Sequence, residues 1–110
     1  MFPRRLYAHR GASLECPENT LVSFQRAAEL GVHALETDVH MTADGVIVVS
    51  HDPDSRRMGD RALEWRRVDF AAAQTVDLGW AFADAAGQHP WRARGVRVLA
   101  LEELLTTFTN

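Results

Sequence analysis

Three side chains that could take part in metal or acid–base chemistry lie on either side of the dipeptide Asp44-Gly45. Asp-Gly between two apolar runs predicts a hairpin, because it tolerates the positive φ angles of tight turns. Glu36 and Asp38 are two positions apart, so they share one face of the strand that precedes this turn. A two-residue loop at Asp44-Gly45 sets Asp38 opposite His51, and the group then suits a divalent cation beside an acid/base. A three-residue loop with a bulge sets His51 opposite Thr37 instead and breaks up the group.

The elements that must position these residues follow a strand–helix–strand order. Residues 5–9 form a candidate strand. Asn19 is a good N-cap for a helix that begins at Thr20, and Gly31 stands where a C′ glycine ends it. The second strand begins at Ala34, and this order favours a parallel sheet in an α/β fold.

A second pair of polar residues, His9 and Arg10, follows directly on the first strand. Glu36 and Asp38 lie where the second strand ends. In α/β folds the carboxyl ends of adjacent parallel strands meet at one edge, which is where sites form. We therefore expect the two pairs to share one site with His51. The alternative interpretation is that His9 and Arg10 form a surface pair and that the carboxylates and His51 only face water.

The composition is that of an ordinary globular protein. The 110 residues are 46% hydrophobic and 25% charged, with a net charge of −3, which argues against a nucleic-acid surface. No uncharged apolar run approaches the ~18 residues of a transmembrane helix, and the first residues lack the apolar region of a signal peptide. All twelve basic residues are Arg, so lysine chemistry is not available within the chain. Cys16 is the single cysteine, which suits a reducing compartment, and we expect a cytoplasmic protein without stable membrane insertion.

Residues 51–98 are less regular and hold eight of the twelve Arg and all three Trp. We interpret this segment as an excursion from the sheet that could wall one side of a pocket. The alternative is a plain surface insertion whose arginines are solvated. The spacing of apolar residues then predicts an amphipathic helix over Leu101–Phe108.

Several short motifs occur in a fixed order at close spacing. They are His9-Arg10-Gly11-Ala12, Pro17-Glu18-Asn19-Thr20, Glu36-Thr37-Asp38-Val39, Thr42-Ala43-Asp44-Gly45, Val48-Val49-Ser50-His51-Asp52, Asp77-Leu78-Gly79 and Leu101-Glu102-Glu103-Leu104. Together they resemble the N-terminal part of the glycerophosphodiester phosphodiesterase family. The resemblance implies an α/β fold, with residues 1–110 forming the N-terminal part of a TIM-type (β/α)₈ barrel and an insertion after the second strand.

The resemblance also implies roles for particular residues. His9 and His51 would be the acid/base pair, and Arg10 would contact the phosphate. Glu36 and Asp38 would bind a divalent metal, Mg²⁺ or Ca²⁺. The implied reaction is hydrolysis of a small-molecule glycerophosphodiester to glycerol 3-phosphate and an alcohol, with water or a glycerol hydroxyl as the nucleophile. These residue types suit that chemistry, because a metal and a guanidinium stabilise charge on phosphate oxygens and imidazoles move protons near neutral pH.

The sequence departs from the family in two respects. Leu99-Ala100-Leu101 stands where the family commonly has Pro-Thr-Leu, which affects a helix cap. A complete barrel needs about 250 residues, and a further metal-ligating Glu and a Lys that the family supplies from a later strand are not among these 110. Two other functions therefore stay open: a related phosphodiesterase of phospholipid head groups, and a non-catalytic remnant that binds metal, phosphate or a partner chain. A chain of this length could also associate with itself.

Overall fold

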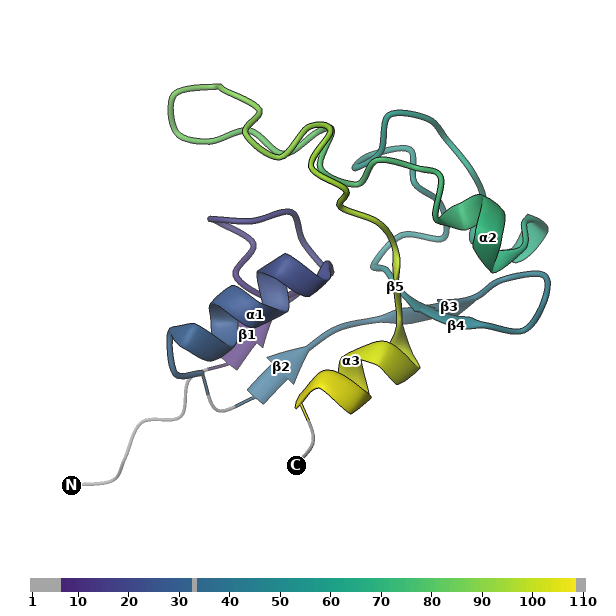
Figure 1. Cartoon of the computed structure of the whole chain (residues 1–110), viewed down its shortest axis with the longest axis horizontal. Coiled ribbons are helices and arrows are strands. Elements are labelled where there is room, and N and C mark those ends of the chain that lie inside the picture. The colour runs from purple at the N-terminus through teal and green to yellow at the C-terminus, as the bar shows by residue number, and fades with distance from the viewer. Residues whose placement is uncertain (1–6, 33, 109–110) are drawn as a thin grey trace.

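The computed structural model describes residues 7–32 and 34–108 (Figure 1). In chain order the elements are β1 (Tyr7–His9), α1 (Leu21–Glu29), β2 (Ala34–Glu36), β3 (Val39–Met41), β4 (Ile47–Val49), the 3₁₀ helix η1 (Trp65–Arg67), α2 (Phe70–Ala73), β5 (Leu99–Ala100) and α3 (Leu101–Phe108). β1 and β2 form one sheet, and β3, β4 and β5 form a second sheet in that order. None of the described helices is long and apolar enough to cross a membrane.

The predicted strand–helix–strand unit is confirmed. β1 and β2 pair in parallel through the connecting helix α1, and the register aligns His9 with Glu36. Arg5 and Leu6, which the predicted first strand also included, lie outside the described residues. Because both strands end at the same edge, the residues that follow them are brought together, as the sequence predicts.

The C-terminal end of α1 follows its local sequence signal. Gly31 has a φ of 78°, a left-handed conformation that glycine adopts without strain. Its N–H donates to the carbonyl oxygen of Ala28, and the N–H of Val32 donates to that of Ala27. These two bonds make a Schellman motif, so the predicted stop at Gly31 is confirmed.

The predicted N-cap of α1 is wrong by one residue. Thr20 occupies the cap position without a side-chain capping bond, and its hydroxyl donates instead to the carbonyl oxygen of Pro17 at 2.6 Å. Asn19 has a φ of 56°, and its Oδ1 accepts a hydrogen bond from the hydroxyl of Thr37 at 2.6 Å. A contact with the segment between β2 and β3 therefore takes the place of the local cap.

The loop of the β3–β4 hairpin is longer than the predicted two residues. Val39 pairs with Val49, which places Thr42 opposite Val46. The N–H of Thr42 donates to the carbonyl oxygen of Val46 at 2.9 Å, and residues 43–45 form the loop. This is the three-residue alternative, in which a turn is followed by a residue in the left-handed region, here a glycine with a φ of 84°.

The predicted pairing of Asp38 with His51 is therefore wrong. Ser50 stands opposite Asp38, and its N–H donates to the carbonyl oxygen of Asp38 at 3.0 Å. The ladder ends at this point and the chain bends at His51. Alternation along a strand consequently no longer determines the direction of the His51 side chain, which the hairpin argument had assumed.

Asp44 ties the tip of the hairpin to the next helical segment. Its Oδ1 accepts hydrogen bonds from the hydroxyl of Thr42 and from the N–H of Phe70, the first residue of α2. The hydroxyl of Thr42 is the main cause that lowers the pKa of Asp44 below its ordinary value. The two residues of the Asp-Gly pair thus have different roles. The glycine allows the turn, and the aspartate attaches the turn to the start of α2.

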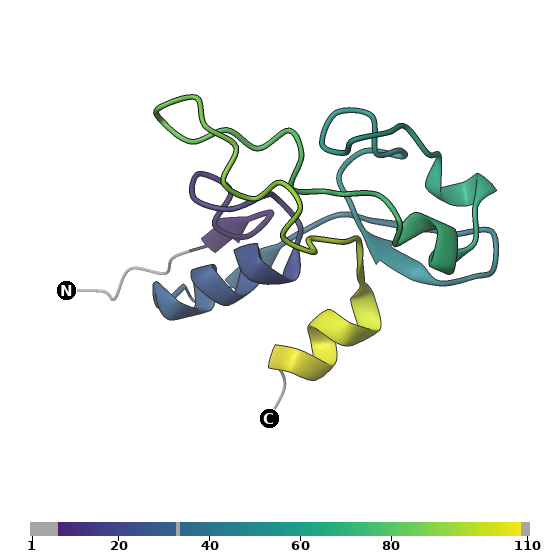
Figure 2. The ribbon, with the colours of Figure 1, turned by 45° about the horizontal axis from the view of Figure 1, so that its top comes forward.

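Successive residues of β4 face two different apolar cores. Residues 50–98, between β4 and β5, are called the 50–98 segment below. Val48 packs with Trp65 and Val98 of this segment in one core. Val49 packs with Phe24 of α1 and Leu104 of α3 in the other core. Figures 1 and 2 show α2 on one side of the hairpin and α3 on the other. The consecutive apolar residues Val48 and Val49 fit one strand, because successive side chains of a strand point to opposite faces and both faces are buried here.

The 50–98 segment supplies most of the apolar core around Val48 but has little regular structure. Asp77 is buried, and its carboxylate accepts hydrogen bonds from the N–H groups of Gly79 and Ala93, both at 2.9 Å. A Cβ on Gly79 would lie 2.2 Å from the carbonyl oxygen of Trp91, so this position requires glycine. The motif Asp77-Leu78-Gly79 therefore closes the base of a long loop. That residues 51–98 are an insertion stays a prediction.

The C-terminal helix is confirmed with the predicted bounds, as α3. The strand before it, β5, was not predicted. It pairs antiparallel with β4, with Leu99 opposite Val49. Leu99-Ala100 is too short for a periodicity signal, and its extended conformation is stabilised by pairing with β4 and by burial of Leu99 against Phe24 and Leu104.

Candidate functional site

His9 and Glu36 stand side by side at the carboxyl ends of the paired strands. The Nε2 atom of His9 lies 3.4 Å from Oε1 of Glu36, and the N–H of Arg10 donates to the carbonyl oxygen of Glu36 at 2.7 Å. The side chains of His9 and Glu36 are 57% and 69% exposed, so water screens their pairing. Both groups are accessible to a ligand.

The turn after β1 is fixed against α1. Arg10 and Gly11 both have positive φ angles, 62° and 82°. A Cβ on Gly11 would lie 2.3 Å from the Oγ atom of Ser23, so only glycine allows this approach. The carbonyl oxygen of Arg10 accepts hydrogen bonds from the Ser23 hydroxyl and the Asn19 N–H. The glycine in the His-Arg-Gly motif therefore serves the placement of the two polar residues before it.

Two buried donors beside this turn have no hydrogen-bond partner among the described residues. They are Nε of Arg10 and Nδ2 of Asn19, and Asn19 is only 4% exposed. Among the described residues, the guanidinium of Arg10 has one weak polar contact, from Nη1 to the carboxylate of Glu18 at 3.4 Å. Unpaired buried donors are costly, so both atoms can gain by binding an acceptor such as a phosphate oxygen.

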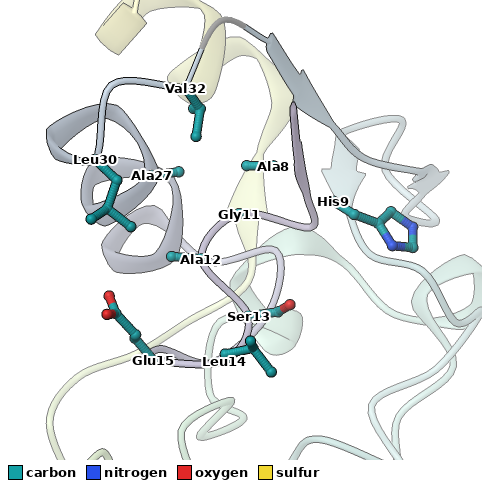
Figure 3. A pocket seen from close by; sticks show the side chains of 10 residues that line it. All are labelled: Ala8, His9, Gly11, Ala12, Ser13, Leu14, Glu15, Ala27, Leu30 and Val32. Carbon is teal, nitrogen blue, oxygen red and sulfur yellow. The ribbon is translucent and has the colours of Figure 1, made fainter. Parts of the chain in front are cut away.

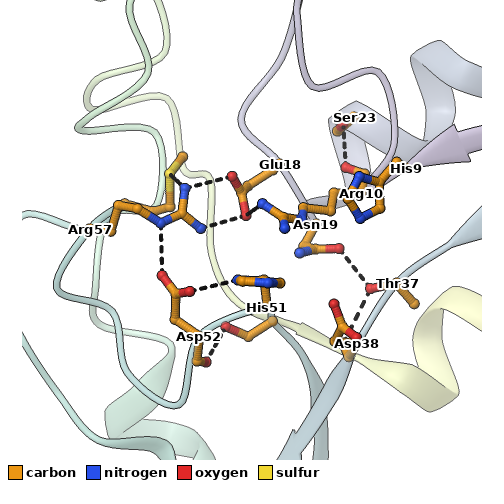
Figure 4. Close-up of polar contacts among 12 residues, drawn as sticks. His9, Arg10, Glu18, Asn19, Ser23, Thr37, Asp38, His51, Asp52 and Arg57 are labelled. Atoms are coloured by element: carbon orange, nitrogen blue, oxygen red, sulfur yellow. Dashed lines mark hydrogen bonds and ion pairs between the residues drawn. The ribbon is translucent and has the colours of Figure 1, made fainter.

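A continuous chain of polar side-chain contacts joins His51 to the β1–α1 loop. Nδ1 of His51 lies 2.7 Å from Oδ1 of Asp52, and Nε of Arg57 donates to Oδ2 of Asp52 at 2.8 Å. The other two guanidinium nitrogens of Arg57 donate to the two oxygens of Glu18, each at 2.7 Å (Figure 4). Because Glu18 is in the loop after β1, this network ties that loop to the 50–98 segment.

The network shifts the pKa values of its members. The hydrogen bond from Arg57 is the main reason that the pKa of Glu18 lies below its ordinary 4.5. Burial alone would raise the pKa of Asp52, but hydrogen bonds from His51 and Arg57 outweigh it and lower the pKa. The pairing with Glu18 raises the pKa of Arg57. All three groups are therefore held in their charged forms.

The stability of the folded chain is expected to fall in acid because of Glu18. Its folded pKa is lowered, so its contribution is complete above the ordinary value of 4.5 and is lost as the pH falls through the lower folded value. In Glu18→Gln the free energy of unfolding, measured by urea denaturation between about pH 6 and pH 3, should vary less than in the wild type. Glu29→Gln, at a side chain that is 67% exposed, is the control. Equal pH slopes for wild type and Glu18→Gln would contradict this expectation.

Of the predicted site residues, His9, Arg10, Asp38 and His51 are drawn about the buried amide of Asn19 in Figure 4. Figure 4 shows Asp38 and His51 extending toward this amide from one side and Arg10 and His9 on the other. The predicted strand that carries both Glu36 and Asp38 is interrupted, because β2 ends at Glu36 and β3 begins at Val39. Alternation along one strand therefore does not set the two carboxylates on a shared face, and His51 follows the ladder rather than belonging to it.

Sequence reasoning gave no role to Glu18, Asp52 and Arg57. A signal for Asp52 was present, since a carboxylate next to a candidate acid/base histidine can orient it. Glu18 and Arg57 are 39 positions apart, and no local pattern connects them.

The donor set at this edge fits a hard divalent cation in part. Glu36 and Asp38 are exposed carboxylates, the ligand type that Mg²⁺ and Ca²⁺ prefer. Within residues 7–32 and 34–108, no group of three His, Cys, Asp or Glu side chains is close enough to hold an ion. Such cations take six or more oxygens, so water, substrate or other residues would have to complete the coordination.

A separate cavity of about 340 Å³ lies behind β1 and is not organised for chemistry. Its lining is largely apolar, with Ala8, Ala27, Leu30 and Val32 among the contributors. Figure 3 shows the imidazole of His9 pointing away from these side chains. The imidazole of His9 is therefore not directed into this cavity.

Comparison with known proteins identifies relatives along most of the chain. Residues 9–110 match the profile of the glycerophosphoryl diester phosphodiesterase family. Glycerophosphodiester phosphodiesterase domain-containing protein 4 of Macaca fascicularis is 54% identical over 86 residues, which cover 78% of this chain and 13% of that protein. A glycerophosphodiester phosphodiesterase of Bacillus subtilis is 34% identical over 106 residues, which cover 92% of this chain and 35% of the enzyme.

Solved structures agree with these matches. The glycerophosphoryl diester phosphodiesterase domain of a Mycobacterium tuberculosis protein superposes with a TM-score of 0.91 at 26% identity, covering 98% of this chain and 41% of that one. An Oleispira antarctica phosphodiesterase, solved with the product sn-glycerol-3-phosphate, has a TM-score of 0.76 at 26% identity, covering 94% of this chain and 39% of that one. These neighbours confirm an α/β TIM-type fold, of which the chain spans less than half the length.

Proposed function

This chain belongs to the glycerophosphoryl diester phosphodiesterase family, and on that premise we propose that it carries part of the active site of a metal-dependent phosphodiesterase. The substrate would be a small-molecule glycerophosphodiester and the products glycerol 3-phosphate and an alcohol. The observation that carries the proposal is the placement of Arg10, Asp38 and His51 around one buried amide. We further propose that the enzyme acts in the cytoplasm.

In this proposal Arg10 binds the phosphate. Its guanidinium offers a planar fork of donors, and its Nε lacks a partner among the described residues. The amide nitrogen Nδ2 of Asn19 is a second buried donor that lacks a partner among the described residues. Arg57 is unsuited to this task, because its three nitrogens already donate to two carboxylates.

His9 and His51 are proposed to move the protons of the reaction. One imidazole takes a proton from the nucleophile, and the other gives a proton to the leaving alkoxide. The side chain of His51 is held by Asp52, whereas that of His9, among the described residues, has the exposed contact with Glu36. Glu36 and Asp38 would hold a divalent cation, which when bound supplies positive charge to offset charge on the phosphate oxygens.

Asp38→Ala is expected to weaken metal binding about tenfold or more, because it removes one of two carboxylate ligands from this edge. Binding of Mg²⁺ and of Ca²⁺ is measured by isothermal titration calorimetry. In an active enzyme that contains residues 1–110, excess metal should partly restore turnover of glycerophosphocholine. Glu102→Ala, at an exposed carboxylate on α3, is the matched control. Wild-type metal affinity in Asp38→Ala would remove Asp38 from the proposed metal site.

A further inference from the structure

We propose that Arg57, from the 50–98 segment, is a positioning residue for His51. It acts through Asp52, whose carboxylate it holds in the orientation that fixes the tautomer and direction of the His51 imidazole. This inference rests on the proposed acid/base role of His51. It adds to that role a residue that neither the motifs nor the hairpin argument singled out.

The first step concerns the carboxylate of Asp52. Each of its oxygens has its own donor, His51 Nδ1 on Oδ1 at 2.7 Å and Arg57 Nε on Oδ2 at 2.8 Å. The side chain is 24% exposed, which leaves it partly shielded from competing water. With one donor on each oxygen, rotation of the carboxylate breaks one contact or both.

The second step concerns the proton on His51. An ionised carboxylate can only accept hydrogen bonds, so Nδ1 of His51 must be the donor. In the neutral imidazole this leaves Nε2 as the free acceptor, and in the protonated imidazole Nε2 carries a transferable proton. In the Ser-His-Asp triad a carboxylate likewise holds the catalytic histidine in this tautomer.

The third step concerns Arg57 itself. Its side chain is 47% exposed and would be mobile if it were unpaired, but Nη1 and Nη2 are bound by the two oxygens of Glu18 at 2.7 Å. Glu18 is only 13% exposed and sits on the loop after β1, so it is a well-anchored acceptor. The orientation of His51 therefore depends on the docking of the 50–98 segment onto the β1–α1 loop.

The test reads the tautomer of His51 directly. In ¹⁵N-labelled protein, two-bond ¹H–¹⁵N correlations distinguish the Nδ1–H from the Nε2–H form without any need for turnover. We expect the Nδ1–H form in the wild type and a shift toward the Nε2–H form in Arg57→Gln. This variant loses the Nε donor to Asp52 and the two guanidinium donors to Glu18. Arg66→Gln, at an exposed arginine of η1, is the matched control and should leave the tautomer unchanged. Amide dispersion in the same samples reports whether each variant is folded.

A second variant keeps the proposal testable if Arg57→Gln does not fold. Asp52→Asn leaves the Glu18–Arg57 fork in place but offers an amide donor to Nδ1, and it should produce the same change of tautomer. In an active enzyme that contains residues 1–110, Arg57→Gln should lower kcat about 10- to 100-fold, with KM changed far less. A wild-type tautomer in folded Arg57→Gln or in Asp52→Asn overturns the proposal. Retained turnover in His51→Ala would instead refute the proposed role of His51 and leave the tautomer result standing.

Discussion

His51→Ala is expected to lower kcat about 10²–10⁴-fold in an active enzyme that contains residues 1–110, the usual contribution of a positioned acid/base. The reason lies in the arrangement around the imidazole. Asp52 binds Nδ1 at 2.7 Å, and Nε2 has no hydrogen-bond partner among the described residues. Removing the imidazole removes the proton carrier, whereas the carboxylates of Glu36 and Asp38 stay in place. Metal affinity should therefore change little, which separates this variant from Asp38→Ala.

The measurement is steady-state hydrolysis of glycerophosphocholine at saturating metal, together with a metal titration of each variant. His89→Ala is the matched control, because His89 lies on the long loop after Asp77, where its Nδ1 contacts the backbone oxygen of Phe82. His89→Ala should keep wild-type kcat. Wild-type turnover by His51→Ala would exclude His51 from the mechanism, and a large loss of metal affinity would assign it to metal binding instead.

Local signals predicted the elements whose ends depend on their own residues. Gly31 stops α1 because a left-handed residue is needed there, and the apolar spacing of Leu101–Phe108 specifies α3. Signals failed where a distant contact competed with a local one. Asn19 is a suitable cap by type, but the hydroxyl of Thr37 engages its side chain from 18 positions away.

The candidate site was predictable to the extent that it follows from strand order. Two parallel strands brought His9 beside Glu36, as their positions at the strand ends indicated. The hairpin register was not predictable in the same way, because Asp-Gly is compatible with loops of two and of three residues. The network of Glu18, Asp52 and Arg57 could not be found from periodicity, since it depends on how the irregular 50–98 segment folds back onto the β1–α1 loop.

Residues 1–110 by themselves are expected to show little or no phosphodiesterase activity. Glu36 and Asp38 leave a hard cation short of protein oxygens, so water must fill the remaining positions. The solved relatives are more than twice as long as the part that this chain covers. His9 is 57% exposed on a sheet of two short strands, and its distance from His51 depends on that sheet. Water would screen the charges that act best in an enclosed site, and a small displacement of a proton carrier costs rate steeply.

The assay is purified 1–110 protein with glycerophosphocholine and Mg²⁺ or Ca²⁺, run over a range of protein concentrations beside a His9→Ala control. Background hydrolysis that is equal in the two proteins is the expected result. Turnover that disappears in His9→Ala would contradict the prediction. If that turnover also rose more steeply than protein concentration, the walls of the site would come from association of chains, because a complex forms in proportion to a higher power of concentration.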